Sequence, residues 1–142
     1  MKKAKILFSV LITICILTAC SSDDDSSTSE PTVEELLTSG NWYVESQTDF
    51  SMDDCIKHSN FRFLANGNFI SESYGDDSGT CEMNNTHSGT WEFLSDTEIT
   101  MTYETSTITY TIVTISENEL VFNWMSGGDS LTTILDKNPG NG

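Results

Sequence analysis

Four side chains that can bind a metal or form a covalent bond lie in two polar stretches of the chain. Cys55 and His58 stand in a C-x2-H arrangement, and Cys81 and His87 in a C-x5-H arrangement. Two thiolates and two imidazoles suit Zn²⁺, but these spacings are looser than those of zinc motifs. The alternative is a disulfide between Cys55 and Cys81, which requires an oxidising compartment. We predict the disulfide, because the N-terminus indicates export.

The same two stretches are rich in carboxylates, whose oxygens could hold Ca²⁺. They lack the order of a calcium-binding loop, because Gly79 directly follows Asp76, Asp77 and Ser78. We therefore expect a solvated acidic rim rather than a metal site. The carboxylates are those of Asp49, Asp53, Asp54, Asp76, Asp77 and Glu82.

Catalysis has little support in the sequence. Asp53 and Asp54 could be proposed as an acid and base pair, but adjacent side chains in an extended chain point apart. The serines and histidines stand in no G-x-S-x-G or comparable frame. We predict neither an enzyme nor a cofactor.

The N-terminus is typical of an exported lipoprotein. Residues 1–19 combine a basic start with the mostly apolar run Ile6–Leu17, which is too short to span a bilayer. The run ends in Leu17-Thr18-Ala19-Cys20, which resembles a lipobox, the bacterial signal after which the cysteine is lipidated and becomes the first mature residue. The alternative is an ordinary signal peptide with an incidental cysteine. We expect residues 1–19 to be removed and Cys20 to anchor the protein in a membrane.

The residues after Cys20 bear on the destination of the protein. Ser21, and not an aspartate, follows Cys20. In many Gram-negative bacteria a residue other than aspartate at this position permits transfer of the lipoprotein to the outer membrane. The run Asp23, Asp24 and Asp25 resembles the surface-export signal of some lipoprotein-rich lineages, and a solvated linker is an equal alternative. We therefore expect an outer-membrane lipoprotein, exposed at the cell surface if the acidic run is an export signal.

Charge restricts the partners of the mature chain. Loss of Lys2, Lys3 and Lys5 leaves three basic residues against 22 acidic ones over 123 residues, a formal charge of −19. Such an excess argues against nucleic acid and anionic headgroups as partners. The length suits one domain. Outside the cytoplasm, the remaining pair Cys55 and Cys81 is expected to form a disulfide that contributes roughly 3 kcal/mol.

The elements that position these residues are predicted to be one short helix and eight strands. Residues 20–31 are polar and form a flexible tether. Thr32 and Glu35 resemble a capping box, and Gly40 suits a helix end. Alternating apolar residues then predict strands near 41–48, 60–65, 68–74, 89–94, 97–104, 107–115, 120–126 and 131–136.

Eight short strands with tight turns predict an all-β fold, an eight-stranded up-and-down antiparallel barrel or a closely related sandwich. In such a barrel the long connections 49–59 and 75–88 lie at the same end, and they carry Cys55 and Cys81 respectively. Long loops on a rigid scaffold commonly hold binding residues. We therefore expect the two loops to be joined by the disulfide at an open, binding end of the barrel.

The inward face of the predicted strands is aromatic and aliphatic, and it becomes small and polar at Ser46, Ser71 and Ser73 toward the open end. An apolar interior with a polar entrance is typical of a cup-shaped ligand pocket, although side chains could equally fill the barrel interior. The apolar inward set is Trp42, Val44, Phe61, Phe63, Phe69, Trp91, Phe93, Met101, Tyr103, Ile108, Tyr110, Ile112, Phe122 and Trp124. The residues predicted to bind a ligand are Phe63, Phe69, Ser71, Ser73, Tyr103 and Trp124.

Several short motifs occur together across residues 32–136. They are Gly40-Asn41-Trp42 after the helix, Asp53-Asp54-Cys55, Phe61-Arg62-Phe63, Asn66-Gly67-Asn68-Phe69, Cys81, and Gly89-Thr90-Trp91 at the start of the fourth strand. With this set the chain resembles the lipocalin-like domain family of bacterial lipoproteins, the first motif matching the lipocalin G-x-W. The resemblance implies an eight-stranded barrel, and many members of the family have no known ligand or activity.

We expect residues 32–138 to form a lipocalin-like domain, followed by a disordered tail at 139–142. The predicted function is that of a lipid-anchored, non-enzymatic envelope protein that binds a small apolar ligand, or an envelope protein, at the open barrel end. The alternative is a structural or protein-interaction module with a filled barrel and no small-molecule ligand. The volume and lining of the barrel interior would distinguish these two functions.

Overall fold

The computed structural model describes residues 29–77 and 79–140. Cys20, the predicted signal segment 1–19 and most of the predicted tether lie outside these residues. The elements are α1 (Val33–Leu37), β1 (Asn41–Gln47), the 3-10 helix η1 (Ile56–His58), β2 (Asn60–Phe63), β3 (Asn68–Gly75), β4 (Glu82–Ser95), β5 (Glu98–Tyr103), β6 (Ser106–Ile115), β7 (Glu119–Ser126) and β8 (Asp129–Asp136).

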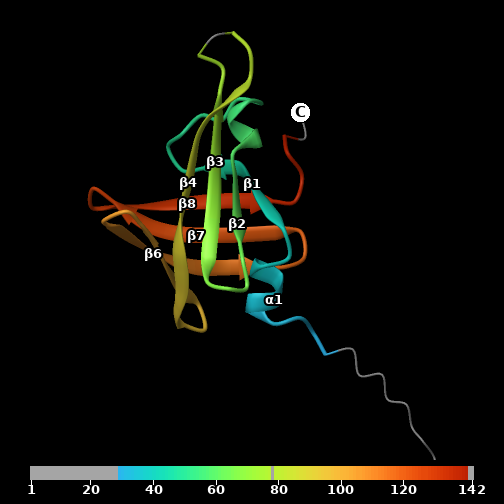
Figure 1. Cartoon of the computed structure of the whole chain (residues 1–142), viewed down its shortest axis with the longest axis vertical. Helices are drawn as coiled ribbons and strands as arrows, with labels where there is room; N and C mark the ends of the chain where they lie inside the picture. Colours follow the sequence, from blue (N-terminus) through green and yellow to red (C-terminus); the bar gives the residue numbers. More distant parts are fainter. Residues whose placement is uncertain (1–28, 78, 141–142) are drawn as a thin grey trace, which may run out of the picture.

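Each strand pairs antiparallel with the next, and β8 returns to pair with β1, which closes an eight-stranded barrel (Figure 1). The predicted up-and-down barrel is therefore confirmed. Its apolar interior is formed by side chains from all eight strands and from α1, as the alternation of apolar residues requires. The core consists of Leu37, Trp42, Val44, Phe63, Phe69, Trp91, Ile99, Met101, Ile112, Leu120, Phe122 and Leu135.

The helix α1 covers one end of the barrel. The Thr32 hydroxyl accepts a hydrogen bond from the Glu35 backbone N–H at 3.2 Å, and a Glu35 carboxylate oxygen accepts one from the Thr32 N–H at 2.7 Å, so the predicted capping box is present. Leu37 is fully buried. The Trp42 indole N–H donates to the Leu37 carbonyl at 2.9 Å, which joins the helix to β1. We call this the closed end.

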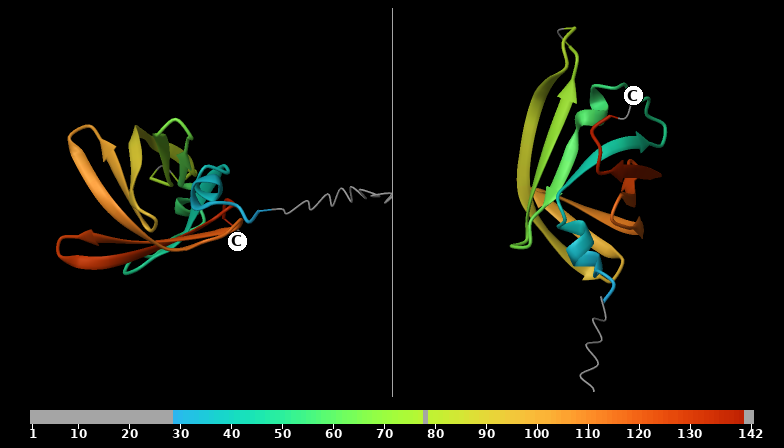
Figure 2. Two further views of the ribbon diagram at one scale, coloured as in Figure 1. Left: turned by 90° about the horizontal axis from the view of Figure 1, so that it is seen from below. Right: turned by 90° about the vertical axis from the view of Figure 1, so that its right-hand side faces the viewer.

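The opposite end carries the connection between β1 and β2, which includes η1, and the connection between β3 and β4. In the right-hand view of Figure 2 the hairpin of β3 and β4 rises at the top, while α1 lies at the bottom. This placement agrees with the two connections that the predicted topology assigned to one end.

One predicted boundary is wrong. We expected residues 75–88 to be a loop and Gly89-Thr90-Trp91 to open the fourth strand, whereas β4 already begins at Glu82. Residues 82–88 pair with β3 from Ile70 to Gly75, and the far part of this hairpin projects beyond the barrel. They are exposed, so they carry none of the apolar alternation from which a half-buried strand is predicted.

Gly89 consequently lies in the middle of a strand. A Cβ atom at this position would collide with the carbonyl of Thr102 on β5 and with the ring of Phe69 on β3. Glycine is therefore required by the close approach of the neighbouring strands rather than by a strand start.

Phe93 also departs from the prediction. It is 36% exposed, although its ring packs edge-on against Trp91 with the centroids 5.4 Å apart. The residue lies near the end of β4 at the closed end, where the strand has passed the core. Within residues 29–77 and 79–140, no helix has both the length and the apolar character needed to cross a membrane.

Candidate functional site

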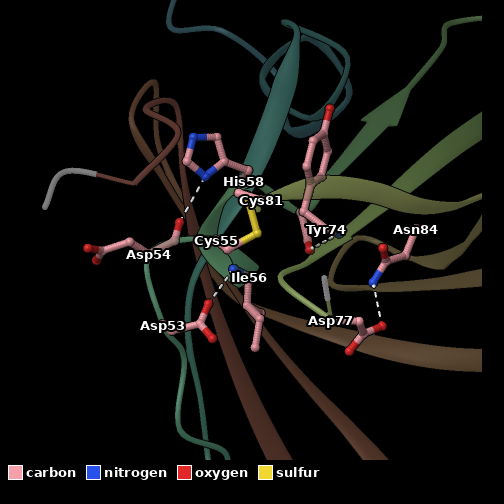
Figure 3. Close-up of a disulfide and its surroundings, with 10 residues drawn as sticks. Asp53, Asp54, Cys55, Ile56, His58, Tyr74, Asp77, Cys81 and Asn84 are labelled. Carbon is pink, nitrogen blue, oxygen red and sulfur yellow. Dashed lines mark hydrogen bonds between the residues drawn. A yellow bond between two sulfur atoms is a disulfide. The ribbon is translucent and has the colours of Figure 1, made fainter. Parts of the chain in front are cut away.

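The two connections at the open end are joined covalently. Cys55, at the start of η1, forms a disulfide with Cys81, just before β4, and their Cα atoms lie 5.4 Å apart (Figure 3). The predicted disulfide is confirmed. Because the two sulfurs are bonded to each other, they do not form the zinc-ligating pair of the alternative interpretation.

Hydrogen bonds hold the residues around the disulfide. The Ile56 backbone N–H donates to the Asp53 carboxylate at 2.8 Å, and His58 Nδ1 donates to the Asp54 carbonyl at 2.8 Å (Figure 3). Among the described residues, no group of three or more His, Cys, Asp or Glu side chains is arranged to hold a metal ion. This segment is therefore built as a rigid support, with the Asp53 carboxylate and His58 hydrogen-bonded to its own backbone.

An ion pair ties η1 to the barrel. Lys57 Nζ lies 2.8 Å from a carboxylate oxygen of Glu45 on β1. The hydrogen bond that the Lys57 ammonium donates to this carboxylate raises the pKa of Lys57. The contact is partly solvated, so its main effect is to orient the connection rather than to add much stability.

Beneath the connection between β1 and β2 lies a cavity of about 280 Å³, which we call the loop cavity. Phe50, Met52 and Ile56 of the connection form its upper side. Ser59 of the same connection and strand residues form the remainder, and half of these residues are apolar or aromatic. They are Val44, Gln47, Ser59, Phe61, Ser71, Glu72, Ser73, Met101, Tyr110, Phe122, Trp124 and Thr133.

A second cavity of about 370 Å³ lies toward β4, and we call it the β4 cavity. Its lining comes from β2 to β7, and five of its residues also line the loop cavity, so the two are neighbouring parts of one hollow. The shared residues are Phe61, Ser71, Met101, Tyr110 and Trp124. The residues that line the β4 cavity alone are Phe69, His87, Tyr103 and Ile108.

Several polar groups of the hollow lie on the wall formed by β3, β4 and β5. Ser71 on β3 stands opposite His87 on β4 in the strand register, and the ring centroid of His87 lies 5.9 Å from that of Tyr103 on β5. The facing side includes Val44, Phe122 and the ring of Trp124, together with the polar Gln47 and Thr133. Such a hollow can accept an apolar molecule and hydrogen-bond to one polar group on it.

Tyr110 lies between the two cavities. Its ring centroid is 5.3 Å from that of Phe122 and 6.0 Å from that of Trp124. Burial raises the pKa of Tyr110 to about 12, so the phenol stays neutral under ordinary conditions. It can therefore donate or accept a hydrogen bond without bringing charge into the hollow.

Five of the six residues predicted to bind a ligand line the hollow. Ser71 and Trp124 line both cavities, Ser73 lines the loop cavity, and Phe69 and Tyr103 line the β4 cavity. Phe63 lines neither cavity. It is only 1% exposed and lies in the core, where its ring packs edge-on against Trp91 with the centroids 5.6 Å apart.

Other lining residues were not predicted as ligand contacts. Phe61, Met101 and Tyr110 were assigned to the inward face only, although they line both cavities. His87 was assigned to a loop. The alternation that places Trp91 and Gly89 on the inner face of β4 also reaches His87, and extending it backward past Gly89 would have identified this residue.

Comparison with known proteins agrees with this architecture. A profile of the lipocalin-like domain family matches residues 38–122, which is more than half of the chain. No curated protein sequence matches the chain significantly.

Two similar solved structures have the same fold at low sequence identity. A lipocalin-like protein from Bacteroides uniformis ATCC 8492 is 13% identical, with a TM-score of 0.52 over 72% of this chain and 99% of that one. Japanin from Rhipicephalus appendiculatus, solved bound to cholesterol, is 12% identical, with a TM-score of 0.53 over 75% of this chain and 79% of that one.

Proposed function

The chain belongs to the family of lipocalin-like domains, and we propose that it binds a small apolar molecule in the hollow formed by the loop and β4 cavities. Members of this family are generally binding proteins rather than enzymes. The observation that carries the proposal is the hollow itself, which is lined mainly by aromatic and aliphatic side chains. Removing such surface from water is favourable at about 25 cal/mol per Å².

The hollow supports ligand binding over the alternative of a filled barrel. A barrel of eight strands is just wide enough either to be filled by side chains or to hold one small ligand. Here side chains fill the closed end, around Trp42 and Phe63, and leave about 280 Å³ in the loop cavity. Japanin, which has a similar fold, was solved with cholesterol bound, and this supports an apolar ligand of moderate size.

We further propose that Cys20 carries a lipid and anchors the protein in the outer membrane, with exposure at the cell surface. The lipobox-like sequence that ends at Cys20 and the position of Ser21 support this location. The chain leading from Cys20 enters the domain at α1, on the closed end. Attachment there leaves the open end accessible to a ligand or to a protein of the envelope.

Lipid attachment is tested by growing cells with radiolabelled palmitate. We expect label in the full-length protein, and its loss together with release from the membrane fraction in the Cys20→Ala variant. An unlabelled protein that is recovered free of membranes would contradict the anchor while leaving the binding function intact.

Ligand binding is tested with the chain from Ser21 onward, which keeps every described residue. Solvent extraction and native mass spectrometry show whether a molecule is bound on purification. Titration with the neutral dye N-phenylnaphthylamine then measures the capacity of the emptied protein, and we expect one dye molecule per chain.

A pair of substitutions identifies the binding place. Ser71 lines both cavities, and Ser71→Phe should fill part of the hollow and weaken dye binding at least about tenfold. The control is Ile70→Phe, which adds a ring on the neighbouring residue outside both cavities. Equal dye affinity in both variants, or no dye binding by the unaltered chain, would contradict the proposed function.

A further inference from the structure

The polar wall of the β4 cavity offers hydrogen-bonding groups that the protein itself does not use. Within the described chain, the hydroxyls of Ser71, Tyr103 and Tyr110 make no hydrogen bond to another protein group, and all three line this cavity. Hydroxyls can both donate and accept. A ligand whose surface near these residues is entirely hydrocarbon would deprive them of water without replacing its hydrogen bonds, which is costly.

His87 adds a fourth polar group to the same wall. Its Nε2 lies 3.1 Å from the side-chain amide nitrogen of Asn85, two residues earlier on β4. An amide N–H donates in this contact and Nε2 accepts, as in the neutral imidazole. The neutral ring carries its own donor on Nδ1, so the wall combines donors and acceptors without a fixed charge.

The hollow does not suit an anionic ligand. Among the described residues that line the two cavities there is neither lysine nor arginine. A bound carboxylate would lose its hydration without gaining a cationic partner.

A cationic ligand is also unfavourable. Glu72 supplies the only carboxylate among the described lining residues, and this carboxylate already accepts a hydrogen bond at 3.1 Å from the amide of buried Asn60. Asn60 and Glu72 are register partners on β2 and β3, so the buried Asn60 amide holds this carboxylate in place. An amine in the hollow would therefore compete with Asn60 for this carboxylate.

From these observations we infer that the ligand is an uncharged apolar molecule with a hydroxyl group, that its hydroxyl binds Ser71, His87 and Tyr103 in the β4 cavity, and that its hydrocarbon part occupies the loop cavity. This inference rests on the proposed function and specifies the chemical class of its ligand. The apolar side of the loop cavity, with Val44, Met52 and Phe122, accommodates the hydrocarbon part.

The test uses three probes of equal chain length near neutral pH, where decanoic acid is ionised, decylamine is protonated and decanol is neutral. Isothermal titration of the chain from Ser21 onward should give a dissociation constant for decanol at least about tenfold lower than for either charged probe. Decanoate or decylamine that binds as tightly as decanol would overturn the inference.

A matched pair of tyrosine variants tests the position of the hydroxyl. Tyr103→Phe removes one partner from the β4 cavity and should weaken decanol binding about three- to tenfold. Tyr43→Phe is the control, because the Tyr43 hydroxyl accepts a hydrogen bond from Asn41 outside both cavities. Equal decanol affinity in the two variants would overturn the assigned position.

The outcomes separate this inference from the function on which it rests. Dye binding without a preference for decanol contradicts the hydroxyl class alone, and the proposed function stands. Failure of the dye and of all three probes to bind contradicts both.

Discussion

The ammonium nitrogen of Lys137 lies 3.3 Å from the centroid of the Trp42 indole ring. Trp42 is fully buried, and its indole N–H is engaged with the Leu37 carbonyl, so the ring face is held in place. Within the described chain, Lys137 Nζ is buried and has no hydrogen-bond partner. The indole face therefore replaces part of the hydration that the amine loses at the closed end.

This environment predicts a pH dependence of stability. Burial lowers the pKa of Lys137 from 10.5 to about 8. Between these values the unfolded chain binds more protons at Lys137 than the folded chain, so the free energy of unfolding rises with pH through this window. We expect the melting temperature of the wild type, relative to Lys137→Met, to increase between pH 8 and pH 10.

The comparison with Lys137→Met removes contributions that both proteins share. Tyr110, whose pKa is raised to about 12, is present in both and cancels in the difference. A melting-temperature difference that stays constant across the window would show that the amine is not held at a lowered pKa.

The close packing around Gly89 predicts a large effect of a small substitution. Gly89→Ala should lower the free energy of unfolding by at least about 1–3 kcal/mol, because the added methyl group forces β4 away from Thr102 and Phe69. Urea denaturation measures the change. Ser88→Ala, at the exposed neighbouring position, serves as the control and should stay within about 0.5 kcal/mol of the wild type.

The disulfide at the open end predicts a redox-dependent stability. Replacing both Cys55 and Cys81 by serine should lower the free energy of unfolding by about 3 kcal/mol, because the bond closes a loop of 26 residues in the unfolded chain. Urea denaturation of the wild type with a reductant should reproduce the value of the double variant. The prediction is wrong if the oxidised and reduced wild type unfold at the same urea concentration.

Much of the architecture could be predicted because a strand that buries one face has apolar and polar residues in alternation along its sequence. Phe61 and Phe63, or Phe122 and Trp124, are separated by one outward residue, and this spacing alone assigns them to the interior. The order of strands then determined which connections share an end. The strand order alone therefore assigns Cys55 and Cys81 to the same end of the barrel.

Other features depend on contacts between distant parts of the chain, which no local pattern encodes. Residues 82–88 of the β3–β4 hairpin are exposed, so this part of β4 has no alternation of apolar residues from which a strand could be predicted. The position of Lys137 over Trp42 follows from the pairing of β1 with β8. Phe63 and Phe61 carry the same sequence signal, yet only packing decides that Phe63 lies in the core and Phe61 lines the hollow.

The apolar mouth of the loop cavity provides a last prediction, on the kinetics of ligand release. Phe50 is 54% exposed although it lines this cavity, so its ring stands where a ligand would enter and leave. Phe50→Ala should remove contacts that hold the ligand and raise the dissociation rate of N-phenylnaphthylamine about five- to tenfold, with a smaller change in the association rate.

Stopped-flow fluorescence with competing unlabelled decanol measures the dissociation rate. The control is Leu94→Ala, because Leu94 is similarly exposed, at 57%, but lies at the closed end outside both cavities. Its loss removes a comparable amount of exposed apolar surface and should leave the rate unchanged. Equal rates in the two variants would mean that the ligand does not pass Phe50, and that the entrance lies on the side of the β4 cavity instead.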